Sequence, residues 1–162
     1  MTTEHGFAGL AGEGYQVRCL VLPQPTPEAC LHLLEVNLTE PLAENRNLLP
    51  VLTEQLKSYF AGIRIDRWEC EPDLSSYPDF HRRVYQAARR IPYGTVFTYG
   101  DVARSIDCPK GAQAVGQALK RNPVPLVIPC HRVVSTRGLG GFTAPGGLET
   151  KKFLLRLEGC RL

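Results

Sequence analysis

The stretch Asn122-Pro123-Val124-Pro125-Leu126-Val127-Ile128-Pro129-Cys130-His131-Arg132-Val133-Val134 carries the strongest structural signal in this chain of 162 residues. Its prolines exclude a helix, because proline lacks a backbone N–H and pushes the residue before it into extended geometry. The residues around them are mostly apolar. We therefore expect Cys130 to lie on a rigid, largely buried, extended segment.

A cysteine beside a histidine and an arginine has the surroundings of a nucleophile. Cysteine reacts as the thiolate, and positive charge nearby lowers the thiol pKa. The alternative is a structural cysteine in a core strand, since free cysteine is among the most buried residue types. His131 and Arg132 argue against that alternative, because a plain core strand has no use for two adjacent polar side chains.

Length and composition indicate a globular protein of one domain or two small lobes. Hydrophobic residues make up 43% of the chain and charged residues 22%, which is ordinary for this class. The net charge of +3 permits nucleic-acid binding without arguing for it. No apolar run reaches the ~18 residues that span a bilayer, and Met1 to Gly14 does not read as a signal peptide. Six cysteines without C-x-x-C spacing fit a reduced, cytoplasmic protein.

The N-terminal half is expected to form a small α/β lobe. Met1 to Gly14 is glycine-rich and reads as a poorly ordered lead-in. The expected elements are a strand at Tyr15 to Leu22, a helix or strand at Glu28 to Leu38, a helix at Asn47 to Ala61 with Gly62 as its C-cap, and a short strand at Ile63 to Cys70. The turn formers of Glu71 to Pro78 mark a linker, so the predicted lobes are residues 1–76 and 77–162.

The C-terminal half is predicted to be mainly helical. The expected helices are Asp79 to Arg90, Tyr99 to Ile106, Ala112 to Arg121 and Leu148 to Glu158, with Asp79 and Thr98 as N-caps of the first two. Thr136 to Gly147 is a glycine-rich loop.

The second and third of these helices, joined by a short turn, look like a helix-turn-helix. The third helix has small residues on one face and ends in Lys120 and Arg121. Such a face suits close approach to a nucleic-acid backbone or entry into a narrow groove. Helix-on-helix packing also favours alanine and glycine, so both interpretations stay open.

Several motifs together resemble one known family, the methylated-DNA–protein-cysteine methyltransferases, or O6-alkylguanine-DNA alkyltransferases. The resemblance covers roughly residues 78–160. It rests on the following motifs, which run in the order of the family: Ile91-Pro-Tyr-Gly-Thr-Val96, Thr98-Tyr99, Ala114-Val115-Gly116, Asn122-Pro123-Val124-Pro125, Pro129-Cys130-His131-Arg132-Val133, Gly141-Phe142-Thr143-Ala144-Pro145-Gly146-Gly147-Leu148, Lys151, and Leu154-Leu155-Arg-Leu-Glu158-Gly159.

The resemblance implies an α/β fold with two lobes. The first would be a ribonuclease-H-like lobe with a small sheet, and the second a mainly helical lobe with the helix-turn-helix and the active site. It further implies double-stranded DNA containing O6-alkylguanine as partner, entry from the minor groove, and flipping of the damaged base towards Cys130. The implied DNA-binding residues are Gln113, Ala114, Gly116, Gln117, Lys120 and Arg121.

The resemblance also assigns roles around Cys130. His131 is the base that deprotonates the thiol, Glu158 orients His131, Tyr99 donates to the leaving base, and Asn122 organises the site. Adjacent residues on an extended segment point to opposite faces, so a bridging water or a bend is needed between Cys130 and His131. Backbone groups near Cys130 and Val133 would accept from the guanine amine. The loop with Phe142, Thr143 and Ala144 would close the substrate pocket.

The chemistry is substitution at a saturated carbon, which suits a soft thiolate nucleophile. The product is a thioether that water does not hydrolyse, so each molecule is expected to act once. We expect no cofactor and no metal to be needed, and we expect the protein to be a monomer. Gln113 departs from the family, which usually has an arginine there to fill the space left by the flipped base. Glutamine has less reach and no charge, so base flipping is less assisted or Lys110, Lys120 and Arg121 compensate.

Three other functions remain to be weighed. A papain-like hydrolase would need its cysteine and histidine far apart in sequence. Zinc binding by Cys19, Cys30 and His32 lacks a short-spaced cysteine pair and an obvious fourth ligand. A non-catalytic alkyltransferase-like protein, which flags lesions for other repair pathways, shares the scaffold but lacks the nucleophilic cysteine, and the presence of Cys130 argues against it.

Overall fold

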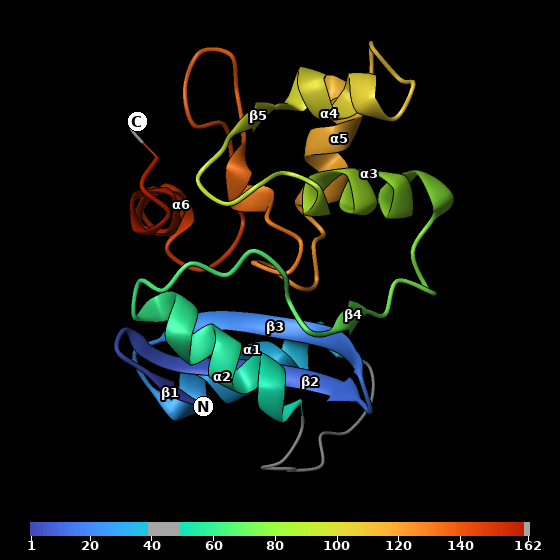
Figure 1. Ribbon diagram of the computed structural model, residues 1–162. Coiled ribbons are helices and arrows are strands. Elements are labelled where there is room, and N and C mark those ends of the chain that lie inside the picture. Colours follow the sequence, from blue (N-terminus) through green and yellow to red (C-terminus); the bar gives the residue numbers. More distant parts are fainter. Residues whose placement is uncertain (39–48, 161–162) are drawn as a thin grey trace. The chain divides into compact units, whose positions relative to one another are not determined.

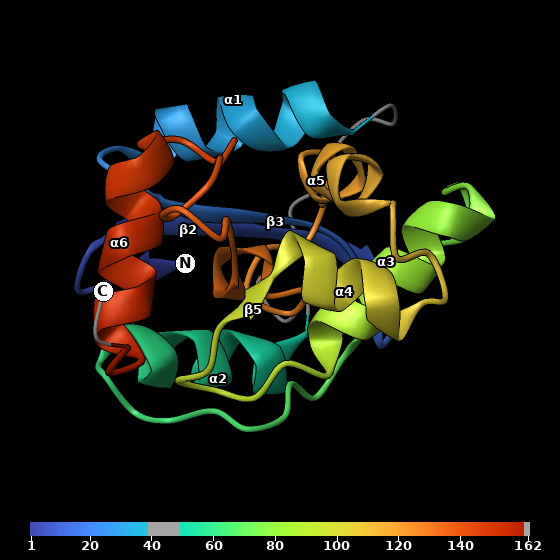
Figure 2. The same ribbon diagram turned by 90° about the horizontal axis from the view of Figure 1, so that it is seen from above.

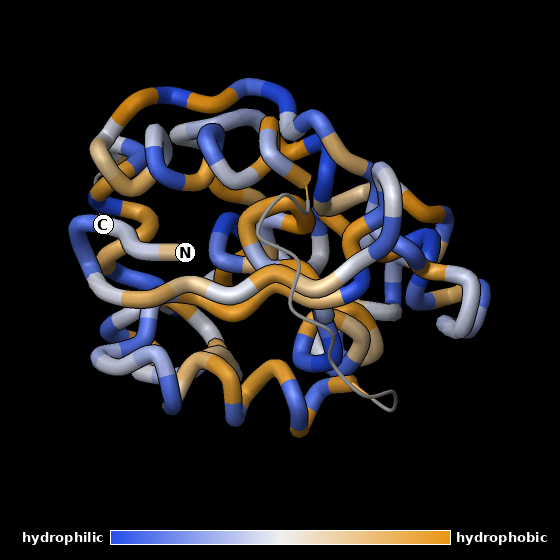
Figure 3. The backbone as a smooth tube through the Cα atoms, turned by 90° about the horizontal axis from the view of Figure 1, so that it is seen from below, coloured by the Kyte–Doolittle hydropathy of each residue, from blue (hydrophilic) through white to orange (hydrophobic). Residues whose placement is uncertain are grey.

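The protein is an α/β protein with two compact units, Met1–Leu74 and Ser75–Leu162. The structure is a computed structural model that describes residues 1–38 and 49–160, and Figure 1 shows its elements. Hydrophilic and hydrophobic residues alternate along the helices (Figure 3), as expected where one face of each helix packs inward. Among the described residues, no helix has the length and apolar character needed to cross a membrane.

The N-terminal unit is built on a four-stranded sheet with the order β1-β2-β3-β4. Its strands are β1 (Thr2–Thr3), β2 (Gly6–Glu13), β3 (Gln16–Gln24) and β4 (Glu71–Pro72). The first three are antiparallel, and β4 runs parallel to β3. Two helices, α1 (Pro27–Asn37) and α2 (Pro50–Phe60), lie on opposite sides of this sheet (Figure 2).

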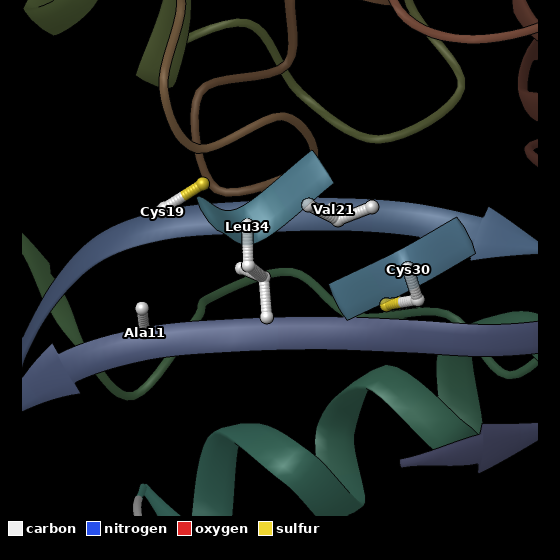
Figure 4. Close-up of a cluster of buried hydrophobic side chains, with 5 residues drawn as sticks. All are labelled: Ala11, Cys19, Val21, Cys30 and Leu34. Carbon is white, nitrogen blue, oxygen red and sulfur yellow. The ribbon is translucent and has the colours of Figure 1, made fainter. Parts of the chain in front are cut away.

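The expectation of a poorly ordered Met1 to Gly14 was wrong, because this stretch supplies β1 and β2. Its glycines serve close packing. A Cβ at Gly9 would lie 2.8 Å from the sulfur of Cys30 and 2.8 Å from a methyl carbon of Leu34, so the missing side chain lets α1 approach the strand. Cys19 and Cys30 join Ala11, Val21 and Leu34 in the resulting apolar cluster (Figure 4).

The two predicted segments after β3 are both helical where they are described. The ambiguity at Glu28 to Leu38 is resolved as α1, since Thr26 caps it by accepting from the N–H of Ala29 at 3.2 Å and Pro27 fits its first turn. The helix predicted from Asn47 corresponds to α2 from Pro50 onwards, and Asn47 and Leu48 lie outside the described residues. Gly62 follows the cap residue Ala61 with a φ of 80°.

The strand predicted at Ile63 to Cys70 was wrong. This stretch is a loop, and the side chain of Gln55 holds it by donating to the carbonyl of Arg67 at 2.9 Å and accepting from the N–H of Glu69 at 2.8 Å. The strand forms directly after this loop, as β4. There the backbone N–H groups of Glu71 and Asp73 donate to the carbonyls of Tyr15 and Val17, at the edge of the sheet.

The C-terminal unit packs four helices around the Cys130 stretch. Its elements are α3 (Asp79–Arg89), β5 (Phe97–Thr98), α4 (Tyr99–Ser105), α5 (Ala112–Leu119), the 3-10 helix η1 (Cys130–Arg132), β6 (Val133–Val134) and α6 (Gly147–Leu157). β5 and β6 pair in parallel, so the residue that begins α4 lies next to the chain leaving Cys130.

The predicted caps in this unit had different outcomes. Thr98 caps α4 as predicted, in a capping box with Asp101 whose carboxylate accepts from the N–H of Thr98 at 2.7 Å. Asp79 was predicted to cap α3, but the cap position is Pro78, without a side-chain hydrogen bond. Asp79 lies in the first turn instead, where its charge still favours the helix.

The Cys130 stretch is buried, as predicted, but it is not extended. Residues 124–129 are all buried, and the chain turns back on itself, with the N–H of Ile128 donating to the carbonyl of Val124 at 2.9 Å. Leu126 takes a φ of 73°, which is uncommon for a branched side chain. The prolines exclude an α-helix without enforcing a strand, and Cys130 itself begins η1.

Candidate active site

Cys130 is held by Asn122, which lies in the turn after α5. The side-chain amide of Asn122 donates to the sulfur of Cys130 at 3.1 Å and to the carbonyl of Ile128 at 2.8 Å. The amide oxygen of Asn122 accepts from the N–H of Val124 at 3.0 Å. One side chain thus fixes the turn before the cysteine and touches its sulfur.

His131 and Glu158 form a buried pair directly behind the cysteine. The Nε2 of His131 and the Oε1 of Glu158 are 2.7 Å apart, and both side chains are fully buried. The Nδ1 of His131 is also buried, and it has no hydrogen-bond partner among the residues that the structure describes. A bridging water or a bend was expected between Cys130 and His131, and the chain does bend there, since both residues belong to η1.

Arg132 binds the same carboxylate. Its Nε donates to Oε2 of Glu158 at 2.8 Å, and one terminal nitrogen donates to Oε1 at 2.9 Å. The other terminal nitrogen donates to the carbonyl of Ile91 at 2.7 Å. The guanidinium also lies over the ring of Tyr93, 5.7 Å from its centroid. Arg132 therefore pins the segment and directs its charge towards Glu158.

Burial and these contacts shift three pKa values. Burial raises the pKa of Cys130 above its ordinary value, against the Asn122 hydrogen bond and the charge of Lys151. Burial lowers the pKa of His131, and the hydrogen bond to Glu158 opposes it. Burial alone would raise the pKa of Glu158, but its hydrogen bonds to His131 and Arg132 outweigh it and hold that pKa far below the usual range. In the resting site the imidazole is therefore neutral beside a charged carboxylate.

Tyr99 lies between α5 and the glycine-rich loop. Its hydroxyl donates to the carbonyl of Gly141 at 3.4 Å. A Cβ at Gly140 would lie 2.8 Å from the tyrosine ring and 2.9 Å from its hydroxyl oxygen, and Gly140 has a φ of 72°. Burial, and then the nearby Cys130, raise the pKa of Tyr99. The phenol therefore stays protonated and remains a proton donor.

Lys151 is a site residue to which the sequence argument gave no role. Its ammonium is fully buried and donates to the carbonyls of Val133 at 2.6 Å and Gly141 at 3.2 Å. It lies 5.9 Å from the ring centroid of Tyr99 and 6.0 Å from that of Phe142. Burial lowers its pKa to about 8. The signal was present in the sequence: a lone lysine at helical spacing from Leu154 and Leu155, on the apolar face of α6.

The remaining predicted pocket residues come from β6 and the loop before α6. Val133 is buried, and its carbonyl already accepts from Lys151. Phe142 and Ala144 are half-buried. The exposed Thr143 donates from its hydroxyl to the carbonyl of Lys120 at 3.1 Å, which ties the loop to the end of α5.

The predicted DNA-binding residues share one surface of α5 and the turn after it. The buried side of α5 is Val115, Ala118 and Leu119. Gly116 is half-buried, beside the ring of Tyr99. The remaining predicted contacts are exposed: Gln113, Ala114, Gln117, Lys120 and Arg121. This leaves a surface of small and polar residues that ends in two cations.

The candidate zinc ligands are not gathered. Cys19 and Cys30 belong to the apolar cluster under α1, whereas His32 is exposed. Burial raises the pKa of Cys19 to about 11, which disfavours the thiolate that a metal needs. Within residues 1–38 and 49–160, no three side chains of the types that bind metals form a group able to hold an ion.

Together these contacts define a class of protein: one with a cysteine held by an asparagine amide, followed by a histidine in a buried pair with a carboxylate, on a helical unit where one helix exposes small and polar residues. Comparisons with known proteins narrow the class. A family model described as 6-O-methylguanine DNA methyltransferase, DNA binding domain, matches residues 79–160. The chain is 42% identical over 131 residues to the methylated-DNA–protein-cysteine methyltransferase of Methanopyrus kandleri, covering 79% of this chain and 96% of that one.

Solved structures agree with the sequence comparisons. The O6-methylguanine methyltransferase of Mycobacterium tuberculosis is 33% identical, with a TM-score of 0.78 that covers 98% of this chain and 89% of that one. A structure of the M. tuberculosis protein in complex with DNA is 31% identical, with a TM-score of 0.75, covering 98% of this chain and 90% of that one. The chain belongs to the methylated-DNA–protein-cysteine methyltransferase family.

Proposed function

We propose that this protein repairs DNA by transferring an alkyl group, such as methyl, from O6 of guanine to the sulfur of Cys130, once per molecule. The observations that carry the proposal are the hydrogen bond from the amide of Asn122 to the sulfur of Cys130 and the buried His131–Glu158 pair, which begins at the next residue. A thiolate is a strong, soft nucleophile and reacts well at a saturated carbon.

The transfer balances with groups of this chain alone. The thiol proton passes to Nδ1 of His131, directly or through one water, and the bond from Nε2 to Glu158 leaves Nδ1 as the acceptor. The sulfur bonds to the alkyl carbon while the bond from that carbon to O6 breaks. The guanine leaves with the electron pair and takes up a proton from Tyr99. His131 then gives its extra proton to solvent, and the Tyr99 phenolate takes one up from solvent. The thioether product is stable to water, and no step needs a cofactor or a metal.

The surface of α5 supports double-stranded DNA as the partner. We propose that α4 and α5 act as a helix-turn-helix that enters the minor groove, with Ala114, Gly116 and Gln117 close to the backbone and Lys120 and Arg121 on phosphates. The target guanine would then leave the stack to reach Cys130, as base-modifying enzymes require. The M. tuberculosis structure in complex with DNA supports the same partner.

The residues proposed for DNA binding and for alkyl transfer all lie in the C-terminal half of the chain. We assign residues 77–162 to DNA binding and alkyl transfer, and residues 1–76 to a ribonuclease-H-like lobe. We propose a monomer as the acting unit. A thiol reserved for one reaction must stay reduced, which favours the cytoplasm.

An alkyltransferase-like protein that only flags lesions is the weaker alternative. Such a protein has no use for a thiol held by Asn122 beside a proton acceptor, so the structure around Cys130 favours transfer.

Intact mass tests the proposal. The protein is incubated with O6-benzylguanine, or with a duplex containing O6-methylguanine, and weighed. One benzyl or methyl group should be added, and Cys130→Ala should remove the addition. Cys108→Ala is the matched control, because Cys108 is equally half-buried but lies in the turn before α5, and it should leave the addition intact. An unmodified wild type, or an adduct that persists in Cys130→Ala, would overturn the proposal.

A further inference from the structure

Glu158 has all of its acceptor positions filled by groups from two segments of the chain. Oε1 is bonded by His131 at 2.7 Å and by Arg132 at 2.9 Å. Oε2 is bonded by Arg132 at 2.8 Å and by the N–H of Gly94 at 3.1 Å. A carboxylate offers about four acceptor sites, so this one is saturated, and two of its bonds come from one guanidinium in the bidentate geometry that is the strongest for this pair.

This arrangement differs from a histidine–carboxylate pair that stands alone. There the carboxylate is the only charge beside the imidazole and favours the imidazolium. Here the charge of Glu158 is already balanced by Arg132, and the imidazole is fully buried. The bond to Glu158 still directs the Nε2 proton, which leaves Nδ1 as the acceptor.

We propose that Arg132 is a positioning residue for proton transfer: its bidentate pair with Glu158 keeps His131 neutral, with Nδ1 free to take the proton of Cys130. The inference deepens the proposed function and rests on it, because it assumes that His131 is the base. The guanidinium of Arg132 is directed to Glu158, Ile91 and Tyr93. It acts through Glu158, while its bond to Ile91 fixes the guanidinium.

Other titratable groups face the same place from the neighbouring elements. Lys151 of α6 also disfavours the imidazolium, and its pKa of about 8 leaves it charged through the acidic range. Cys160 and Tyr93 lie near the Arg132–Glu158 pair, and Cys130 is the proton donor. Below about pH 7, cysteine and tyrosine at ordinary pKa values keep their protons, and Lys151 with a pKa of about 8 is mostly charged, so a change there reports His131 or the carboxylate.

The test is the titration of His131 in unreacted protein, followed by NMR of the 15N-labelled imidazoles. The chain has four histidines, and the His131→Gln variant assigns the signal. Arg132→Met removes the cation and frees the carboxylate, so the titration midpoint of His131 should rise by about one pH unit or more. The acid limb of the pH–rate profile with O6-benzylguanine should move to higher pH in the same variant.

Two matched variants separate charge from structure. Arg132→Met/Glu158→Gln removes both charges, and its His131 midpoint should shift by less than half as much as in Arg132→Met. Tyr93→Phe deletes the hydroxyl that donates to the carbonyl of Leu157 at 3.0 Å and leaves every charge in place, so the midpoint should not move. An unmoved midpoint in Arg132→Met, or an equal shift in the double variant, would overturn the inference.

The inference stays testable if Arg132→Met does not fold. Should Arg132→Met not fold, the double variant leaves no unpaired buried charge and decides alone: a midpoint within about one unit of the wild type supports the inference, and a larger displacement overturns it. The titration needs no alkyl transfer, so a missing adduct in the mass experiment would count against the proposed function only.

Discussion

Asn122 holds the sulfur of Cys130 across 3.1 Å with the same amide group that donates to the carbonyl of Ile128. The amide stabilises the thiolate as well as the turn that presents it. A hydrogen bond to a charged group contributes about 1.5–3 kcal/mol, which corresponds to a rate change of about tenfold to a hundredfold.

Asn122→Ala should therefore slow adduct formation on Cys130 by about tenfold to a hundredfold. The measurement is the rate of mass gain with O6-benzylguanine, which needs no DNA and so isolates the chemistry. Gln86→Ala, an exposed amide on α3, is the control and should react at the wild-type rate. A wild-type rate in Asn122→Ala would show that the amide does not assist the thiolate.

Lys151→Met should weaken both the fold and the reaction. The substitution leaves the buried carbonyl of Val133 without this donor and leaves that of Gly141 with Tyr99, and an unpaired buried carbonyl destabilises by about 1–3 kcal/mol. It also removes the cation nearest to the thiolate. The free energy of unfolding, measured with denaturant, and the rate of reaction with O6-benzylguanine should both fall. The matched control is Lys152→Met, whose ammonium lies at the surface and pairs with Glu149. Indistinguishable behaviour of the two variants would contradict this prediction.

Stability should fall as the pH drops below about 6.5, and His131 should be a main cause. The pKa of His131 is lowered in the folded protein, so below the unfolded value of about 6.5 the unfolded chain binds a proton that the folded chain refuses. The free energy of unfolding then falls by up to about 1.4 kcal/mol per pH unit. Glu158, whose folded pKa is depressed, adds its own loss only below its unfolded value of about 4.3.

Denaturant unfolding between about pH 5 and pH 7 checks this. His131→Gln keeps a donor towards Glu158 but cannot titrate, so the slope should become shallower in that variant. An unchanged slope would assign the pH dependence to another group.

Gln113→Arg should raise the rate on double-stranded DNA more than the rate on free O6-alkylguanine. Gln113 is exposed near the start of α5, and a longer, charged side chain there can fill the space left by a flipped base and hold phosphates. The free base needs no flipping, so it serves as the internal control. Equal effects on both substrates would remove the idea that Gln113 limits flipping.

Local signals in the sequence predicted the C-terminal helices well. Thr98 with Asp101 three residues later is a capping box that can be read without a structure, and α3 has strong apolar periodicity. Where the prediction erred, tertiary contacts decided. The 3-10 turn at Cys130 depends on Asn122 and on the φ of 73° at Leu126, and no residue type at position 126 announces that conformation.

The same limit applies to the charged residues of the site. The position of Arg132 close to Cys130 in sequence suggested direct activation of the thiol. Only its bonds to Glu158, 26 residues away in sequence, show that its charge faces that carboxylate. β1 and β2 were missed because glycine-rich sequence usually signals loops, whereas here Gly9 allows α1 to pack closely on the strand.

The bonds from Tyr93 to Leu157 and from Gly94 to Glu158 each join residues 64 positions apart. Contacts this distant in sequence form late, since the entropy of closing a long loop must be overcome first. Until α6 docks, His131 lacks its carboxylate and Cys130 is an ordinary thiol. If O6-benzylguanine is added at different times during refolding, the fraction of alkylated chains should therefore equal the fraction in which the C-terminal unit is complete.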